Sequence, residues 1–167
     1  MERLELSRVV SEAGYCAGNY GNVVVVEWRD RPTKAAVDRV SVIVEELLAA
    51  QDGPIAFLVI ARGNGAAPDT DARDGFAKTM KSHADRIAGA VLVIEGTGLR
   101  SAAVRAVATA ISLLGGGWGW QACATADEGV EHAARLLQKA GDPTMLPSML
   151  SLAVSRLRQT PPEPAAG

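Results

Sequence analysis

Apolar residues along the chain change their spacing from one stretch to the next, and each spacing predicts a different element. In "PTKAAVDRVSVIVEELLAAQDG" they recur every three or four positions, which is typical of an amphipathic helix, and Pro32 and Gly53 mark its start and stop. The runs "PIAFLVIA" and "GAVLVIE" are continuously apolar and rich in branched residues, so they indicate strands buried on both faces. This pattern predicts helices that alternate with buried strands.

The N-terminal part of the chain has a strand pattern without a helix. The stretches "SRVVSEAGYC" and "YGNVVVVEW" predict two strands, and "AGNYGN" between them predicts the turn of a hairpin. Because the first predicted helix follows directly, this hairpin is expected to begin the domain.

Two further helices are predicted where the apolar spacing becomes helical again. Their apolar stripes are Phe76, Met80, Ala84 and Ile87 in the first, and Val104, Val107, Ala108, Ile111 and Leu114 in the second. A short strand is predicted in "GGGWGWQACA", and a last helix in "TADEGVEHAARLLQKAG" begins with a capping box formed by Thr125 and Glu128.

The resulting order is β-β-α-β-α-β-α-β-α, which predicts an α/β domain over residues 1–141 whose mixed sheet has a parallel core. Residues 142–158 predict a short amphipathic helix that starts near Pro147, and an isolated helix of this length would need to dock on its own domain or on a second copy. Residues 159–167 have the composition of a disordered tail.

Composition and charge exclude several classes of function. The 167 residues are 48% hydrophobic, which suffices for a core, and the formal net charge of −2 without a basic stripe argues against a nucleic-acid partner. No run approaches the roughly 18 apolar residues of a membrane span, and no apolar export signal is evident. With two cysteines, Cys16 and Cys123, we expect a reduced cytoplasmic protein.

The turn "EGTGLRS" resembles a nucleotide-binding loop but lacks its defining residues. Gly96 and Gly98 fit the first two glycines of a dinucleotide fingerprint, whereas Ser101 replaces the third and the ribose-binding acid is missing. There is no Walker lysine either, so we expect no cofactor and no stabilisation by NAD, ATP or GTP. The amides of this helix start, with Arg100 alongside, could instead hold an anion or a carboxylate of a partner.

The acidic loop "DTDARDG" does not fit a metal site. Arg73 and Met80 occupy positions that a calcium loop gives to ligands, so Asp69 or Thr70 is expected to cap the second helix. His83 borders an apolar stripe and is expected to be a partly buried histidine with a satisfied partner. Cys123 fits a small core residue, and no metal ligand set is predicted.

Trp118 and Trp120 are two residues apart and would share one face of a strand. They could pack in the core under a helix, or form an exposed aromatic platform for a partner. Both readings stay open at this stage.

The element order, with "VVVVEW" before the first helix and "AGAVLVIEGTGLRSAAVRAV" at the third crossover, resembles a STAS domain. This is the fold of anti-sigma-factor antagonists and of sulfate-transporter C-terminal regions, and the chain is most similar to small stand-alone bacterial STAS-like proteins. The resemblance covers about residues 6–140 and implies helices packed mainly on one face of the sheet. In regulatory members a Ser or Thr at the start of the second helix is phosphorylated and switches partner binding. Thr70 stands nearest to that site, without the preceding Asp-Ser and with acids on both sides.

These observations predict a non-enzymatic interaction or regulatory module of signal transduction that binds a protein partner, with self-association as a further possibility. Because the ends of parallel strands meet at one edge of a sheet, the loop at 62–75 and the turn at 96–100 are expected to form the partner surface together. Its expected residues are Arg62, Asn64, Asp69, Thr70, Asp71, Gly96, Gly98 and Arg100, with Thr70 as candidate phosphorylation site. The alternative is a small-molecule or lipid-binding STAS-like protein.

Overall fold

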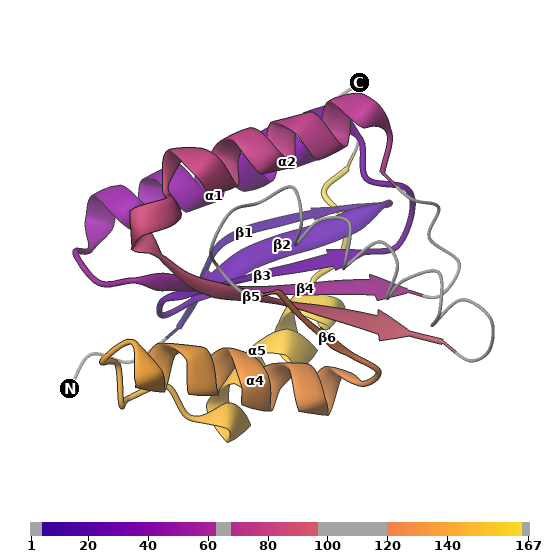
Figure 1. The fold of residues 1–167 in the computed structure, drawn as a ribbon. Helices are drawn as coiled ribbons and strands as arrows, with labels where there is room; N and C mark the ends of the chain where they lie inside the picture. The colour runs from indigo at the N-terminus through magenta and orange to yellow at the C-terminus, as the bar shows by residue number, and fades with distance from the viewer. Residues whose placement is uncertain (1–4, 63–67, 97–119, 165–167) are drawn as a thin grey trace.

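A computed structural model describes residues 5–62, 68–96 and 120–164 of the chain (Figure 1). In chain order its elements are the strands β1 (Leu6–Glu12), β2 (Tyr15–Tyr20) and β3 (Val23–Trp28), helix α1 (Lys34–Ala50), strand β4 (Ile55–Arg62), helix α2 (Thr70–Ser82), strands β5 (Ile87–Glu95) and β6 (Trp120–Cys123), and helices α4 (Ala126–Lys139) and α5 (Pro147–Gln159). The helix predicted from the stripe at 104–114 and the residue Trp118 lie outside the described residues.

The six strands form one mixed sheet in the order β1-β2-β3-β4-β5-β6. The first two neighbouring pairs are antiparallel, and β3, β4, β5 and β6 run parallel to one another. The predicted α/β class and the mixed sheet with a parallel core are therefore confirmed. Parallel neighbours that follow one another along the chain require crossover helices, and α1 and α2 serve as two of them.

The prediction of two N-terminal strands is wrong, because the structure has three. The stretch "AGNYGN" contains most of β2, and the turn after it is at Gly21, whose φ is 52°. Small residues suggested a turn, but β2 lies between two other strands, with all its residues buried. A Cβ on Gly18 would lie 3.1 Å from the backbone oxygen of Ser7, so glycine here permits the close approach of β1.

Helices cover both faces of the sheet, so the prediction of helices mainly on one face is wrong for the described part of the chain. Figure 1 shows α1 and α2 on one side of the strands, and α4 and α5 on the other. Each face has its own apolar core: one joins α1 and α2 to the sheet, and the other joins α4 and α5 to it. Alternate residues of β3 explain the division, since Val24 and Val26 face the first core and Val23 and Val25 the second.

Helix boundaries follow from local capping. The Thr33 hydroxyl accepts from the amide of Ala36 at the start of α1, and Asp69 Oδ1 accepts from the amide of Ala72 at the start of α2. α2 ends at Ser82, so Ala84 lies in a short 3₁₀ turn (Ala84–Arg86), and Ile87 begins β5. The predicted apolar stripe of this helix was therefore too long, because Ala84 and Ile87 lie outside α2.

Helix α5 docks on its own domain, which is one of the two predicted alternatives; the other was docking on a second copy. Its apolar stripe packs against α4 and the sheet, and it comprises the buried residues Leu150, Ala153, Val154 and Leu157. The chain after it does not form a disordered tail at once. The Glu163 amide donates to the backbone oxygen of Ser11 at 2.7 Å, and the Ser11 hydroxyl donates to the Thr160 oxygen at 3.0 Å. These bonds satisfy polar groups of β1, the edge strand.

Candidate functional site: the carboxyl edge of the parallel strands

Charged side chains gather where the parallel strands β3, β4 and β5 end. We name this group the carboxyl-edge cluster; its members are Glu27, Arg29, Arg62, Glu95 and Arg158. Arg62 and Glu95 are the last residues of β4 and β5 and are partners in the register of these strands. The edge of the sheet predicted to carry the partner surface therefore does bring charged groups together.

Glu27 is the centre of this cluster. Its side chain is 1% exposed, although it is ionisable and ends a run of four valines. An isolated buried carboxylate would be very unfavourable, so it requires cationic partners. Arg158 on α5 provides the closest contact, since its Nε donates to Glu27 Oε2. Arg62 Nη2 lies 2.9 Å from Glu27 Oε1, and Arg29 Nε lies 3.7 Å from the same oxygen.

Strand alternation explains why these side chains meet. Val23 and Val25 face the core under α4 and α5, so Glu27, two residues further, points to the same face. Glu95 follows Val91 and Val93 in the same way on β5. Arg158, in the last turn of α5, bridges the two carboxylates, with Nη2 donating to Glu95 Oε1 at 2.6 Å.

The charges of the cluster do not cancel. Three guanidinium groups and two carboxylates leave one net positive charge. The Arg62 side chain is 49% exposed and approaches Glu27 Oε1 without the alignment of a hydrogen bond, so it retains donors that can face outwards. Arg158 and Arg29 are 28% and 20% exposed and are engaged within the protein. Arg62 is therefore the member best placed to receive an external carboxylate or phosphate.

The start of α2 holds the next predicted residues. Asp69 caps the helix, as expected, and its side chain is used for that bond. Thr70 is exposed at the first position of the helix, with its hydroxyl 3.3 Å from Arg73 Nη2. Asp71 lies in the first turn, where an acid favours the positive end of the helix. Its charge also raises the pKa of Lys34, after the larger effect of Asp38, which is 2.6 Å from the Lys34 ammonium group.

The other predicted residues are placed only in part. Gly96 follows Glu95 directly and has a φ of 151°, in the region that favours glycine, which fits its predicted role in the turn. Asn64, Gly98 and Arg100 lie outside the described residues. Of the predicted partner surface, the structure therefore describes Arg62, the start of α2 and Gly96.

Sequence reasoning missed Glu27, Arg29, Glu95 and Arg158. A signal existed for Glu27, because a single acid at the end of an apolar strand needs a compensating charge. Nothing local points to Arg158, which is 131 residues away along the chain. Only the docking of α5 on the sheet brings the two together.

Other candidate residues have structural roles. His83 Nε2 lies 2.8 Å from Glu45 Oε1 with its side chain 21% exposed, so the expectation of a satisfied, partly buried histidine is confirmed. Burial raises the pKa of the Cys16 and Cys123 thiols, which disfavours the reactive thiolate, and neither residue is in a disulfide. Trp120 packs with Phe76 at a ring distance of 5.9 Å, which favours the core reading for this residue.

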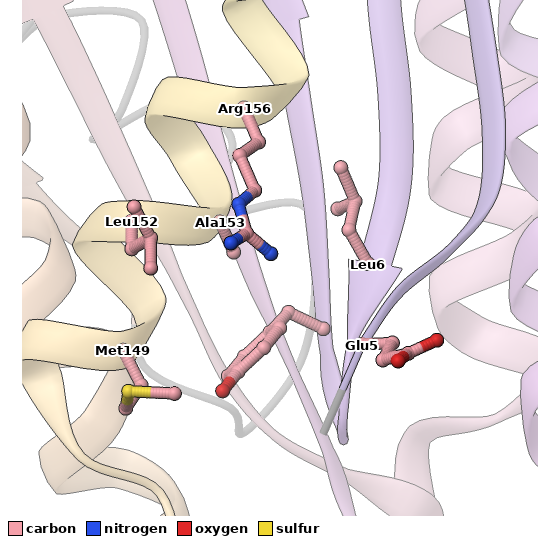
Figure 2. A pocket seen from close by; sticks show the side chains of 7 residues that line it. Glu5, Leu6, Met149, Leu152, Ala153 and Arg156 are labelled. Carbon is pink, nitrogen blue, oxygen red and sulfur yellow. The ribbon is translucent and has the colours of Figure 1, made fainter. Parts of the chain in front are cut away.

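A second feature is a pocket of about 280 Å³ between α5 and the beginning of the sheet (Figure 2). Its walls are Leu6 from β1, Tyr20 from β2, and Met149, Leu152 and Ala153 from α5, with Glu5 and Arg156 at the rim. Tyr20 ends β2 and pairs with Val23, the first residue of β3, so the pocket lies at the amino end of the parallel strands. The carboxyl-edge cluster is at the opposite end.

Comparison with known proteins gives no relative: no family model, no curated protein and no solved structure matches the chain. Among the described helices, none is long and apolar enough to cross a membrane. Within the described ranges, no group of three His, Cys, Asp or Glu side chains is arranged to hold a metal ion.

Proposed function

We propose that the chain is a STAS-like, non-enzymatic interaction module that binds a protein partner at the carboxyl edge of its parallel sheet. One observation carries the proposal: Arg62 and Glu95 end neighbouring parallel strands side by side, and the buried Glu27 holds the Arg62 guanidinium at this edge of the sheet. Ligands of open α/β sheets bind at this edge. A half-exposed guanidinium in a fixed position suits recognition of an acidic side chain, because little side-chain freedom is lost on binding.

Regulation by phosphorylation of Thr70 is part of the proposal. The hydroxyl is exposed at the first position of α2, near the Arg73 guanidinium, and a phosphate there would face backbone amides at the positive end of the helix. Asp69 and Asp71 would repel the same phosphate. We therefore expect phosphorylation to change the charge of the surface more than the conformation of α2.

We place the module in the cytoplasm of a bacterial cell as part of the same proposal. Cys16 and Cys123 are both unpaired, which fits a reducing compartment.

The experiment is affinity capture of a partner from the source organism, followed by its reconstitution with purified protein. Arg62→Ala and Thr70→Glu are expected to weaken the reconstituted complex at least tenfold. Arg62→Lys keeps a positive charge for Glu27 but removes the planar guanidinium, so its loss of binding with an unchanged Tm would separate recognition from stability. Arg135→Ala, on the exposed side of α4, is the matched control.

A reconstituted complex that tolerates Arg62→Ala, Arg62→Lys and Thr70→Glu would overturn this assignment. A partner mapped instead to the face of α1, where Val42 is 54% exposed, would do the same.

A further inference from the structure

The pocket between α5 and the sheet has an unusual combination of walls and polar groups. Its walls combine apolar and aromatic side chains with the charged side chains of Glu5 and Arg156, and Met149 and Leu152 on α5 are 41% and 45% exposed. Figure 2 shows these side chains together with that of Arg156 on the helix side of the pocket, and Leu6 on the opposite side. These two apolar side chains are exposed on α5 although its other face is fully buried.

One polar group of the pocket is buried without a partner within the described ranges. The Tyr20 hydroxyl is buried and has no hydrogen-bond partner among the described residues, although Tyr20 is only 4% exposed and lines the pocket. A buried polar group in this state is unfavourable, which makes it a marker of an interaction completed by something else. Burial raises the pKa of Tyr20, and the charge of the nearby Arg156 opposes this shift. The hydroxyl is therefore protonated at neutral pH and can donate.

Arg156 provides the charge. In the described part of the chain its side chain forms no ion pair, and Figure 2 shows its guanidinium directed from α5 into the space between helix and strands. Glu5 is the acid of the pocket, and the same view shows it on the far wall with its carboxylate turned away from Arg156. The pocket therefore combines an arginine without an ion pair in the described residues, an unpartnered tyrosine hydroxyl and apolar side chains.

We infer that this pocket binds a small amphiphile with an anionic head and a short apolar tail. The head, a carboxylate or a similar monoanion, is held by Arg156 and the Tyr20 hydroxyl, and the tail lies against Leu6, Met149 and Leu152. At about 280 Å³ the pocket is smaller than the roughly 300–1,000 Å³ of sites for drug-sized ligands, so its ligand should be small. A fatty acid of eight carbons is a suitable probe.

The argument for this pocket uses none of the residues of the carboxyl-edge cluster, which lies at the opposite end of the parallel strands. Titration calorimetry of the full chain with sodium octanoate is the direct test. We expect saturable binding of one octanoate per chain, with octylammonium, which has the same tail and the opposite charge, binding at least tenfold more weakly. Butanoate is also expected to bind more weakly, because it lacks most of the tail. Equal binding of both charges, or no binding of octanoate at millimolar concentration, would overturn the inference.

Two variants separate recognition from folding. Arg156→Gln is expected to lower octanoate affinity at least tenfold, whereas Arg135→Gln on α4 is the matched control and should leave it unchanged. Tyr20→Phe keeps the aromatic wall and removes the hydroxyl, so affinity should fall while the Tm of the ligand-free protein holds or rises. A merely structural role for Tyr20 predicts no loss of affinity. Unchanged octanoate binding in both pocket variants would refute the assignment.

The source of the amphiphile and the competing occupants are distinguished by two further measurements. Cosedimentation with vesicles of an anionic phospholipid tests a bilayer source, and binding to vesicles without binding of free octanoate would overturn a soluble ligand. Sedimentation of the ligand-free chain tests a second copy on the same surface. If the chain forms a dimer, if Leu152→Glu dissociates it, and if octanoate does not bind, then a second copy covers the pocket and the inference is wrong.

Discussion

Glu27 shows at the scale of one residue how a buried charge is accommodated. Its carboxylate is 1% exposed and lies close to three guanidinium groups, and the nearest of these belongs to a helix at the other end of the chain. Such a group contributes little net stability when it is paired, because desolvation offsets the attraction. It becomes costly when its charge is removed and the arginines remain.

The Glu27→Gln variant should therefore be strongly destabilised. Arg158 would remain partly buried against a neutral amide, and losses of about 3–5 kcal/mol are typical when one partner of a buried pair is removed. The free energy of unfolding is measured by urea denaturation. Glu131→Gln, which breaks the exposed pair with Arg135 on α4, is the control and should cost roughly 0–1 kcal/mol. Equal stability of the two variants would contradict a structural role for the carboxyl-edge cluster.

The buried Tyr15 hydroxyl should make the folded protein less stable at alkaline pH. Burial, and next the charge of Glu12, raise the pKa of its hydroxyl from 10.0 to about 12. Between these two values the unfolded chain releases the proton and the folded chain keeps it, so stability is complete below pH 10 and decreases as the pH rises towards 12. Tyr15→Phe should show a shallower decrease over this range in denaturation measured at several pH values. Parallel profiles for the variant and the wild type would exclude Tyr15 as the cause.

At the scale of elements, the sequence predicts best what local contacts decide. The starts of α1, α2 and α4 were predictable, because Thr33, Asp69 and Thr125 cap these helices with their own side chains. The end of α2 was not, since Ala84 and Ile87 continue the helical spacing although the chain has already turned into β5.

Strand β2 and the carboxyl-edge cluster required knowledge of the whole fold. Cys16, Ala17 and Gly18 are small residues that form a strand because both neighbouring strands surround them. Arg62 was predicted as the first residue of a loop after a buried strand; it is the last residue of β4, and the parallel register places it beside Glu95. The contact from Arg158 to Glu27 depends on how α5 lies on the sheet, which no local pattern encodes.

Substitution by alanine is expected to have opposite effects on stability at two glycines that lie in helices. A Cβ at Gly129 in α4 would lie 2.2 Å from Val93 Cγ2 and 3.1 Å from Leu58 Cδ1, so the helix would have to move away from the sheet. At Gly75 in α2 the nearest atom is Val37 Cγ1 at 3.4 Å, an ordinary contact. Alanine gains roughly 0.8–1 kcal/mol of helix propensity at either position.

We therefore expect Gly75→Ala to stabilise the protein by about 0.5–1 kcal/mol and Gly129→Ala to destabilise it by about 1–3 kcal/mol, the usual cost of overpacking. Thermal and urea denaturation of the two variants show whether each substitution raises or lowers the free energy of unfolding. Stabilisation by Gly129→Ala would mean that α4 can shift on β4 and β5 without loss of packing.

At the scale of the whole molecule, α5 connects the two candidate sites. Its beginning carries Met149 and Leu152 of the pocket proposed to bind an amphiphile, and its end carries Arg158 of the carboxyl-edge cluster. A rigid helix of 13 residues that touches both ends of the sheet could couple ligand binding at one end to partner binding at the other. Octanoate would then change the affinity for the partner, and the partner would change the affinity for octanoate by the same factor.

The same helix should be essential for the folded state. Removing residues 143–167 would expose the core under α4 and α5, where Leu150 and Leu157 are 0% and 1% exposed, and would leave Glu27 without Arg158. Truncating one buried leucine to alanine costs about 2–5 kcal/mol, and a domain has only about 5–15 kcal/mol in total. We expect the truncated chain to lose its cooperative thermal transition and to bind a hydrophobic dye, as compact states with exposed cores do. The matched control removes only residues 160–167, which deletes the two hydrogen bonds to Ser11 and should lower stability by roughly 1–3 kcal/mol while the transition stays cooperative. If the chain ending at residue 142 melted and sedimented like the full chain, α5 would be an accessory segment and could not couple the two sites.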